Sequence, residues 1–482
     1  MLCGSRLKCG TRILVLALLA LAGCTTLSPE GTFSQVADTV ELRLGKQISW
    51  DSGRYEDPVV RSTVDKLLSR PLTAETAVQI ALLNNRELQA TYADLGIAQA
   101  NLVQTELWKN PVIDGALDFS LSGGTPDYTF ALALKVIDIL YIPLRKRVAE
   151  SQLEEAKYRV TAQVMSIAGQ TYLAFVDYLG QQQQSAVLTQ AVRSAAATVE
   201  SGKALRQAGN IADYDFEIEV AQQVQVAAEL ARAQIRVAQA RERVNRLMGV
   251  AGLQTRWRSA NRLPSMPAKD PPNGDVERKA IETSVDLAAS RQRLVTMGRK
   301  YQVVDITSLL PQLHAGGELT RTLGENEAGP TFTVEVPLFD WGQARRASAQ
   351  MEILRARDEF TGLAVRIRSL ARLQRAKLQS ARQTAAYYAN TVVPQAQRLL
   401  ESAERQYNVM QLGVFQLLQA RERQIRVTQE YANVLTTYWQ ERARFAQILA
   451  GKLPDDADGS GTTVASSNVQ TSSMQTISGN QP

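Results

Sequence analysis

The chain of 482 residues carries one pattern twice. Landmarks of the first half recur in the same order in the second, at offsets of about 200 residues: Asn110-Pro111 with Leu310-Pro311, Ile137-Asp138 with Phe339-Asp340, and Gln207-Ala208-Gly209 with Gln411-Leu412-Gly413. Self-similarity at a fixed period is the signature of a repeated structural unit. The sequence therefore predicts two copies of one unit, at 71–250 and 275–450, joined by an equatorial linker at 251–274.

Each half contains a region in which the periodicity changes from helical to two. Apolar side chains alternate there with small or polar ones, around turns rich in glycine. This pattern predicts two β-hairpins, at 112–137 and 312–340, the second with a loop at about 324–329. Strands of about ten residues with one apolar side have the length and pattern of membrane-spanning β-strands. Two soluble hairpins packed on the helices are the alternative that the pattern leaves open.

Long helices flank each hairpin. The periodicity predicts an opening helix, a very long helix and a returning helix in each half, at 73–108, 144–207 and 213–248, and at 275–308, 343–410 and 415–449. The very long helices span about 100 Å at 1.5 Å per residue. A returning helix and an opening helix together have a similar length, so we expect them to stack end to end beside a long helix. The segments 24–70 and 251–274 would form a belt where they meet.

The N-terminus has the features of a lipoprotein signal peptide. Basic residues precede an apolar run that ends in Leu21-Ala22-Gly23-Cys24, which looks like a bacterial lipobox. We expect removal of residues 1–23, acylation of Cys24 and, because Thr25 rather than an aspartate follows, transfer to the outer membrane. An ordinary signal peptide with a chance cysteine is the alternative. An exported chain with one remaining cysteine cannot form an internal disulfide.

The sequence lacks the motifs of common catalytic chemistry. It has one histidine, His314, so one chain cannot supply a multi-histidine metal site. It has neither a Gly-Lys-Ser/Thr phosphate loop nor a Gly-x-Ser-x-Gly motif, and we expect no enzymatic activity, cofactor or metal. The acidic group Asp213, Asp215, Glu217 and Glu219 indicates a solvated helix start, with a metal site as the alternative. The net charge of +6, about half of it in the signal peptide, is too small to indicate nucleic acid.

The duplicated pattern resembles the TolC-like outer-membrane factor family, and the lipobox resembles that of its acylated lipoprotein subgroup. The resemblance rests on three features: Asn110-Pro111 before the first hairpin, the run Val336-Pro337-Leu338-Phe339-Asp340-Trp341-Gly342 after the second, and the two glycine-centred turns. The resemblance covers about residues 70–450 and stops before the tail 451–482, which lacks apolar periodicity and is expected to be disordered. It implies an α+β membrane protein, a trimeric 12-stranded transmembrane β-barrel with four strands per chain, continued by a long periplasmic α-helical coiled-coil barrel. Three copies are also needed on physical grounds, because four strands cannot close a barrel and an open edge cannot face lipid.

The function that this resemblance implies is a passive outer-membrane channel of a tripartite efflux or type I secretion system. Its partners would be a periplasmic adaptor protein, an inner-membrane pump and the lipid bilayer, with the chain lipid-anchored and extending into the periplasm. A structural coiled-coil lipoprotein spacer and a periplasmic adaptor are the alternatives. The four alternating strands favour the channel, because a spacer does not need them and adaptors use small β domains instead. The substrate cannot be read, although Asn85-Arg86-Glu87-Leu88 resembles metal-efflux members.

Two groups of candidate site residues follow from this architecture. The periplasmic tip, which is the expected gate and adaptor-docking surface, has Gly209, Asn210, Asp213, Asp215, Gly413, Val414, Gln419 and Glu422. Glycine permits the left-handed backbone that a sharp reversal needs. The barrel lumen has Asp114, Asp118, Lys135, His314, Glu318 and Glu335. With a neutral histidine this lumen set has a net charge of about −3 per chain, which predicts a modest preference for cations.

Overall fold

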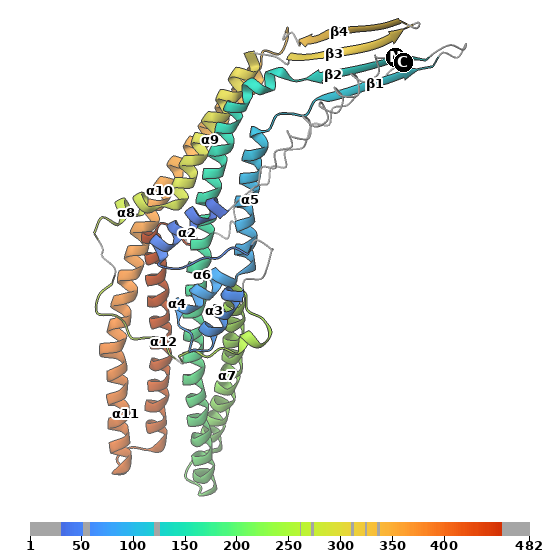
Figure 1. Ribbon diagram of the computed structural model, residues 1–482. Helices are drawn as coiled ribbons and strands as arrows, with labels where there is room; N and C mark the ends of the chain where they lie inside the picture. The colour runs from blue at the N-terminus through green and yellow to red at the C-terminus, as the bar shows by residue number, and fades with distance from the viewer. Residues whose placement is uncertain are drawn as a thin grey trace.

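The computed structural model describes residues 30–51, 58–119, 126–260, 262–270, 274–309, 313–322, 325–334 and 338–455. The molecule is elongated: a body of long helices carries a four-stranded sheet at one end, and two helical hairpins form the other end (Figure 1). The expected signal peptide, Cys24 and most of the expected disordered tail lie outside the described residues.

The duplication is visible in the order of the elements. The first repeat consists of α4 (Ala74–Asn84), α5 (Arg86–Glu106), β1 (Val112–Asp118), β2 (Asp127–Leu134), α6 (Val136–Gln207) and α7 (Asp213–Met248). The second consists of α8 (Val276–Thr283), α9 (Val285–Leu309), β3 (Leu313–Thr322), β4 (Glu325–Val334), α10 (Gln343–Tyr387), the π-helical η2 (Tyr388–Val392), α11 (Val393–Asn408) and α12 (Val414–Ala450). Before and between the repeats lie α2 (Glu30–Leu44), α3 (Pro58–Leu68) and the 3₁₀ helix η1 (Gly252–Arg256).

The opening helix of each repeat is broken, where the sequence predicted a continuous one. In the first repeat the buried Asn85 separates α4 from α5, because its side-chain oxygen accepts hydrogen bonds from the backbone N–H groups of Glu87 (2.8 Å) and Leu88 (3.1 Å). In the second repeat the Ser284 hydroxyl accepts one from the N–H of Leu287 (3.0 Å). A side-chain acceptor that caps a new helix competes with the preceding helix for backbone donors.

The very long helices also differ from the prediction. The helix α6 has 72 residues and begins at Val136, earlier than the predicted residue 144, although Pro143 lies inside it. The predicted continuous helix at 343–410 contains the π-helical η2, which ends at Val392, two residues before Pro394. Proline has no backbone N–H to donate, so the helical ladder readjusts in front of it. Of the helices in the described ranges, none has the length and apolarity to span a membrane.

The four strands form one antiparallel sheet in the order β1-β2-β3-β4, as the fold class predicted (Figure 1). The strand β4 begins at Glu325, whereas the sequence predicted a loop at 324–329. The reason is a tight hairpin in which Thr322 already pairs with Glu325, so ladder hydrogen bonds override the low strand propensity of this glycine-containing stretch. The strands β1 and β4 are the two edges of the sheet.

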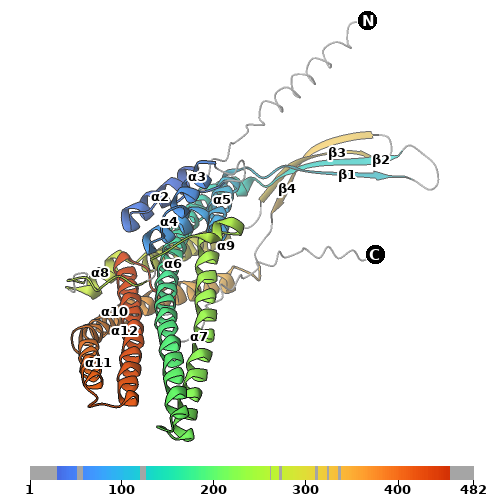
Figure 2. The same cartoon turned by 90° about the horizontal axis from the view of Figure 1, so that it is seen from below.

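Buried aromatic side chains concentrate in a belt partway along the helical body. The indole N–H of Trp257 donates to Asn245 Oδ1 (2.7 Å), and the Arg241 guanidinium lies 4.1 Å from the centroid of the same ring system. On the other repeat, Asp270 accepts a hydrogen bond from the Tyr438 hydroxyl (2.6 Å) and pairs with Arg382 (2.9 Å). These contacts fasten the described part of the linker to both repeats, and the two helical hairpins extend side by side beyond it (Figure 2).

Candidate functional site

The sheet has one polar and one apolar face. The register pairs Asp114 with Ala131 and Ala131 with Glu318, so the two carboxylates lie on the same face. Asp118 and His314 follow the same alternation and share that face. The opposite face carries the large apolar side chains, with Arg321 and Asn326 toward the end of the sheet that is far from the helices; its apolar members include Ile113, Leu117, Phe130, Leu132, Leu134, Leu319, Phe332 and Val334.

The lumen set needs one correction and one addition. Lys135 does not lie in a strand, because β2 ends at Leu134 and Lys135 precedes α6; Glu335 lies outside the described residues. Three carboxylates that sequence reasoning left out, Asp127, Glu325 and Glu327, lie on the polar face. The alternating positions of Glu325 and Glu327 could have indicated a strand, but the glycines at positions 324 and 329 indicated a loop. Six carboxylates therefore share this face of the described strands.

The first tip has the expected geometry. Gly209 adopts a left-handed backbone with φ of +71°, and the N–H of Asn210 donates to the Leu205 carbonyl (2.9 Å). The Asp213 carboxylate pairs with the Arg206 guanidinium (2.7 Å). This ion pair joins α6 to α7, so Asp213 stabilises its own hairpin.

The second tip corrects one expectation. The left-handed residue is Met410, with φ of +59°, whereas Gly413 has φ of −76° and lies at the start of α12. The N–H of Gln411 donates to the Gln406 carbonyl (2.9 Å), so the reversal happens directly after α11. Gly413 then precedes Val414, the first residue of α12, in an ordinary extended conformation that does not require glycine.

The acidic group at the start of α7 does not converge. Asp213 and Glu217 both face Arg206, at 2.7 and 3.7 Å, Asp215 is exposed, and Glu219 faces the second hairpin. Within the described ranges, no group of three or more His, Cys, Asp or Glu residues is arranged to hold a metal ion.

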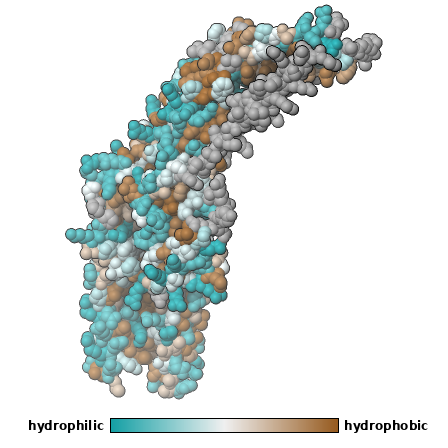
Figure 3. Space-filling model, in the orientation of Figure 1, coloured by the Kyte–Doolittle hydropathy of each residue, from teal (hydrophilic) through white to brown (hydrophobic). Residues whose placement is uncertain are grey.

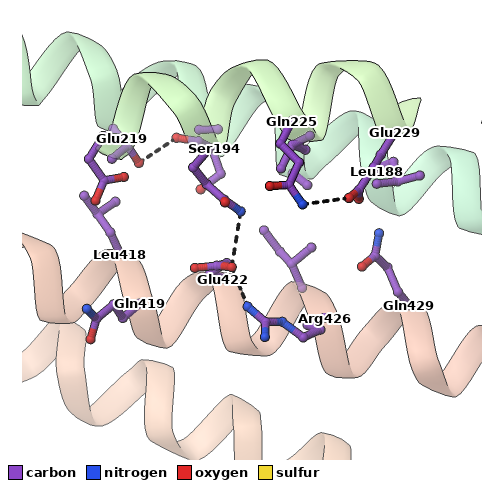
Figure 4. A pocket seen from close by; sticks show the side chains of 16 residues that line it. Leu188, Ser194, Glu219, Gln225, Glu229, Leu418, Gln419, Glu422, Arg426 and Gln429 are labelled. Carbon is purple, nitrogen blue, oxygen red and sulfur yellow. Dashed lines mark hydrogen bonds and ion pairs between the residues drawn. The ribbon is translucent and has the colours of Figure 1, made fainter. Parts of the chain in front are cut away.

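A cavity of about 380 Å³ lies between the two hairpins and extends from about two to about five helical turns from the tips. Figure 4 shows Glu219 from α7 and Glu422 from α12 pointing into it. The Gln222 amide donates to a Glu422 carboxylate oxygen (3.3 Å) and thereby links the two repeats, while Glu422 also pairs with Arg426. The lining comprises Leu188, Ala191, Ser194, Ala195, Thr198, Glu219, Gln222, Gln225, Val226, Glu229, Leu418, Gln419, Glu422, Ile425, Arg426 and Gln429.

The charge in this cavity is predominantly negative. Glu219 and Glu229 from α7 and Glu422 from α12 face Arg426, and the lining from α6 is uncharged. Partial burial, followed by the negative charge of Glu422, raises the pKa of Glu219 above its ordinary value. Polar contacts between partly exposed side chains contribute about 0.2–1 kcal/mol each. The polar contacts between the hairpins are therefore individually weak here.

Of the candidate tip residues, the structure brings Gln419 and Glu422 together in the cavity, and it places Gly209, Asn210, Asp213, Asp215, Gly413 and Val414 at or near the two turns. Glu219 and Gln222 were not singled out as partners of Glu422 because about 200 residues separate them in the sequence. No local spacing signals such a contact.

The long helical body with a four-stranded sheet at one end is the fold of the outer-membrane channels. The chain superimposes on the outer-membrane channel OprN with a TM-score of 0.65 at 17% identity, over 83% of this chain and 94% of that one. For the Campylobacter jejuni CmeC outer membrane channel the TM-score is 0.64 at 16% identity, over 86% and 92% of the two chains.

In sequence, the chain is 23% identical to the cobalt-zinc-cadmium resistance protein CzcC of Cupriavidus metallidurans over 385 residues, which cover 79% of this chain and 90% of CzcC. No protein-family model matches the chain. The resemblance to TolC-like outer-membrane factors is confirmed by these similarities, and the α+β fold class with it.

Proposed function

We propose that the protein is the outer-membrane channel of a tripartite efflux system, through which solutes pass passively from the periplasm to the exterior. The observation that carries this proposal is the sheet: it has one apolar face, one polar face and two open edges, at the end of a helical body whose longest helix extends about 110 Å. The outer-membrane channels that share the fold support it. A pump in the inner membrane would supply the energy, and a periplasmic adaptor would connect the two.

The working assembly is a homotrimer. Open strand edges present unpaired backbone N–H and C=O groups, which cannot face lipid. If β4 of one copy pairs with β1 of the next, three copies close a barrel of twelve strands, an even number within the known range. The apolar face then contacts lipid and the polar face lines the passage.

The passage favours cations. The six carboxylates on the polar face would form rings of negative charge in a trimer, and such rings attract cations into a pore. CzcC is a cobalt-zinc-cadmium resistance protein, which makes divalent metal cations the first solutes to test.

The two helical hairpins at the far end serve as gate and adaptor-docking surface. The link between Gln222 and Glu422 is the kind of weak polar contact that a gate can break at small cost. Gly209 and Asn210 at one turn and Gly413 and Val414 at the other form the exposed ends that an adaptor can reach. Acylation of Cys24 would add a lipid anchor to the barrel.

Two neighbouring substitutions on opposite faces of β2 test the proposal. Leu132→Arg puts a charge on the apolar face, where a lipid-facing arginine costs about 2–4 kcal/mol at mid-membrane depth. Ala131→Arg puts the same charge on the polar face, beside Asp114 and Glu318. We expect loss of heat-resistant trimers from outer-membrane fractions for the first variant and normal trimers with altered conductance in planar bilayers for the second. Equal tolerance of both, or a monomeric parent chain without conductance, would show that the sheet does not cross a membrane.

A further inference from the structure

We propose that the segment after β4, residues 338–341, docks into a cavity at the base of β1 in a neighbouring copy of this chain. The inference rests on the proposed trimer and deepens it, because it names the side chains that seal each junction between subunits.

The receiving cavity lies where the helices meet the sheet. It has a volume of about 440 Å³ and is formed by the end of α5, the residues before β1 and the first turns of α6. Its apolar lining comes from Leu107, Trp108, Leu134, Ile139 and Ile142. The Trp108 side chain at its rim is 71% exposed, which is unusual for the largest apolar side chain in a folded chain.

The segment that we assign to this cavity is strongly apolar, and hydrogen bonds hold its end at α10. Leu338, Phe339 and Trp341 are 69%, 91% and 56% exposed. The N–H of Gly342 donates to Asp340 Oδ1 (2.7 Å), and the Arg346 guanidinium donates to the Trp341 carbonyl (2.8 Å). Aromatic side chains presented on a preorganised segment are the typical anchors of protein interfaces. Figure 3 shows apolar residues gathered on one face where the helices meet the sheet.

Strand direction brings segment and cavity together. The strand β1 runs away from the helices and β4 runs back toward them, on opposite edges of the sheet (Figure 1). Pairing of β4 with β1 of the next copy is therefore antiparallel, like the other pairings in the sheet. The last residue of β4, Val334, then lies near the first residue of the neighbour's β1, Val112. The segment follows Val334 by four residues, and the cavity residue Trp108 precedes Val112 by four, so both lie on the helix side of this junction.

The charge of the cavity also favours residues 338–341 of a neighbouring copy. Asp138 lies between Lys109 and Arg145, 2.7 Å from each, and Lys135 adds a further cation to the lining. Three cations and one carboxylate leave the cavity with a net charge of about +2. Asp340 adds a carboxylate to the incoming segment, and its pairing with Arg345 is long, at 3.5 Å. A second copy of the chain therefore supplies both the apolar anchors and a complementary charge.

Cysteine cross-linking tests this arrangement in the full-length, membrane-assembled protein. Trp108→Cys and Phe339→Cys are combined in one chain, treated with a short bifunctional maleimide and separated under denaturing conditions. We expect covalent dimers and trimers from the double variant and none from either single variant, which also controls for Cys24. The matched control combines Trp108→Cys with Leu253→Cys, another strongly exposed position that lies in the belt, and should give no covalent oligomers.

Native mass measurement of the unsubstituted chain distinguishes failure of the docking from failure of the trimer. A trimer that shows no cross-link between positions 108 and 339, or in which Phe339→Cys reacts freely with a soluble maleimide, would overturn the docking and leave the proposed trimer intact. A chain that stays monomeric would overturn the proposed function itself. If the double variant does not assemble, Phe339→Ala serves instead: we expect its trimers to dissociate in detergent at least about tenfold faster, while Tyr214→Ala at the exposed tip leaves the rate unchanged. Equal rates for these two variants would also overturn the docking.

Discussion

Replacing Glu219 with glutamine should favour the closed arrangement of the two hairpins. Glu219 from α7 and Glu422 from α12 face the same cavity, and the pKa of Glu219 is raised by partial burial and by the negative charge of Glu422. A raised pKa means that the closed arrangement disfavours the ionised carboxylate. The ionised Glu219 carboxylate destabilises the closed arrangement at pH values above its raised pKa. This destabilisation decreases as the pH falls through the raised pKa, and it is fully absent below the ordinary value of 4.5. Acidification should therefore close the channel.

The size of the effect follows from the exposure of the pair. Both glutamates are partly exposed, so solvent screening limits each interaction to about 0.2–1 kcal/mol. In a trimer that gates as one unit, three such interactions add to about 0.6–3 kcal/mol, or a change of about 3-fold to 150-fold in the ratio of closed to open channels. Gln222 can still donate its hydrogen bond to Glu422 in the Glu219→Gln variant, so this attractive contact is retained.

Planar-bilayer recordings at pH 7.5 and at pH 4.0, below the ordinary pKa of a glutamate, provide the assay. The unsubstituted channel should conduct less at the lower pH, and at pH 7.5 Glu219→Gln should conduct less than the unsubstituted channel. The control is Glu229→Gln, since Glu229 lines the same cavity from the same helix but accepts its hydrogen bond from Gln225 within α7. Higher conductance of Glu219→Gln at pH 7.5, or an unaltered pH response, would refute the argument that repulsion between the hairpins controls the gate.

Three further predictions concern the anchor, the passage and the turns. Mass spectrometry of the mature N-terminus should find three acyl chains on Cys24, and an unmodified cysteine would contradict the lipobox assignment. Reversal potentials under a salt gradient should indicate cation preference, and replacing Asp114 and Glu318 by their amides should weaken it; anion preference in the parent channel would show that the polar face does not line the pore. Gly209→Ala should lower the stability of the protein by about 1–2 kcal/mol, because the φ of Gly209 is +71°. Gly413→Ala should leave efflux and trimer stability nearly unchanged, because the φ of Gly413 is −76°. Equal effects of the two substitutions on efflux would show that both turns require glycine.

The features that could be predicted from sequence are those whose signal is local. The returning helix was predicted at 213–248 and α7 has these bounds, because an uninterrupted helical period lies between a turn and Gly249. Alternation likewise predicted which face of the sheet is apolar, since side-chain direction in a strand depends only on parity. The duplication predicted that whatever one half forms, the other forms again.

The remaining features depend on partners far away in the sequence. The start of β4 at Glu325 depends on pairing with β3, and the contact between Gln222 and Glu422 joins different repeats. The left-handed residue of the second tip is Met410, a residue type with no preference for that conformation, so composition pointed to the nearby Gly413 instead. Local propensity is a weak guide where tertiary contacts decide.

The hydrogen bonds of Asn85 show how a local feature depends on a partner far away in the sequence, and substitutions at this residue can measure the contribution of that partner to stability. Its side-chain oxygen caps α5, and its amide also donates to the Leu247 carbonyl (2.8 Å) in the last turn of α7, where helical carbonyls lack intrahelical donors. Loss of an N-cap costs about 1 kcal/mol, and a buried carbonyl left without its donor costs about 1–3 kcal/mol. Asn85→Ala should therefore destabilise the chain by about 2–4 kcal/mol, more than capping alone explains.

Two variants separate the cap from the tie between helices. Ser284→Ala removes the corresponding cap of the second repeat, where the hydroxyl accepts from Leu287 N–H, and should cost only about 1 kcal/mol. Asn85→Asp keeps the capping oxygen but faces the Leu247 carbonyl with a second acceptor, so it should be nearly as destabilising as Asn85→Ala. Thermal unfolding of the detergent-solubilised protein ranks the three. If Asn85→Asp is as stable as the parent chain, the break between α4 and α5 is a matter of local capping, and the stacking of the returning helix on the opening helix does not depend on this hydrogen bond.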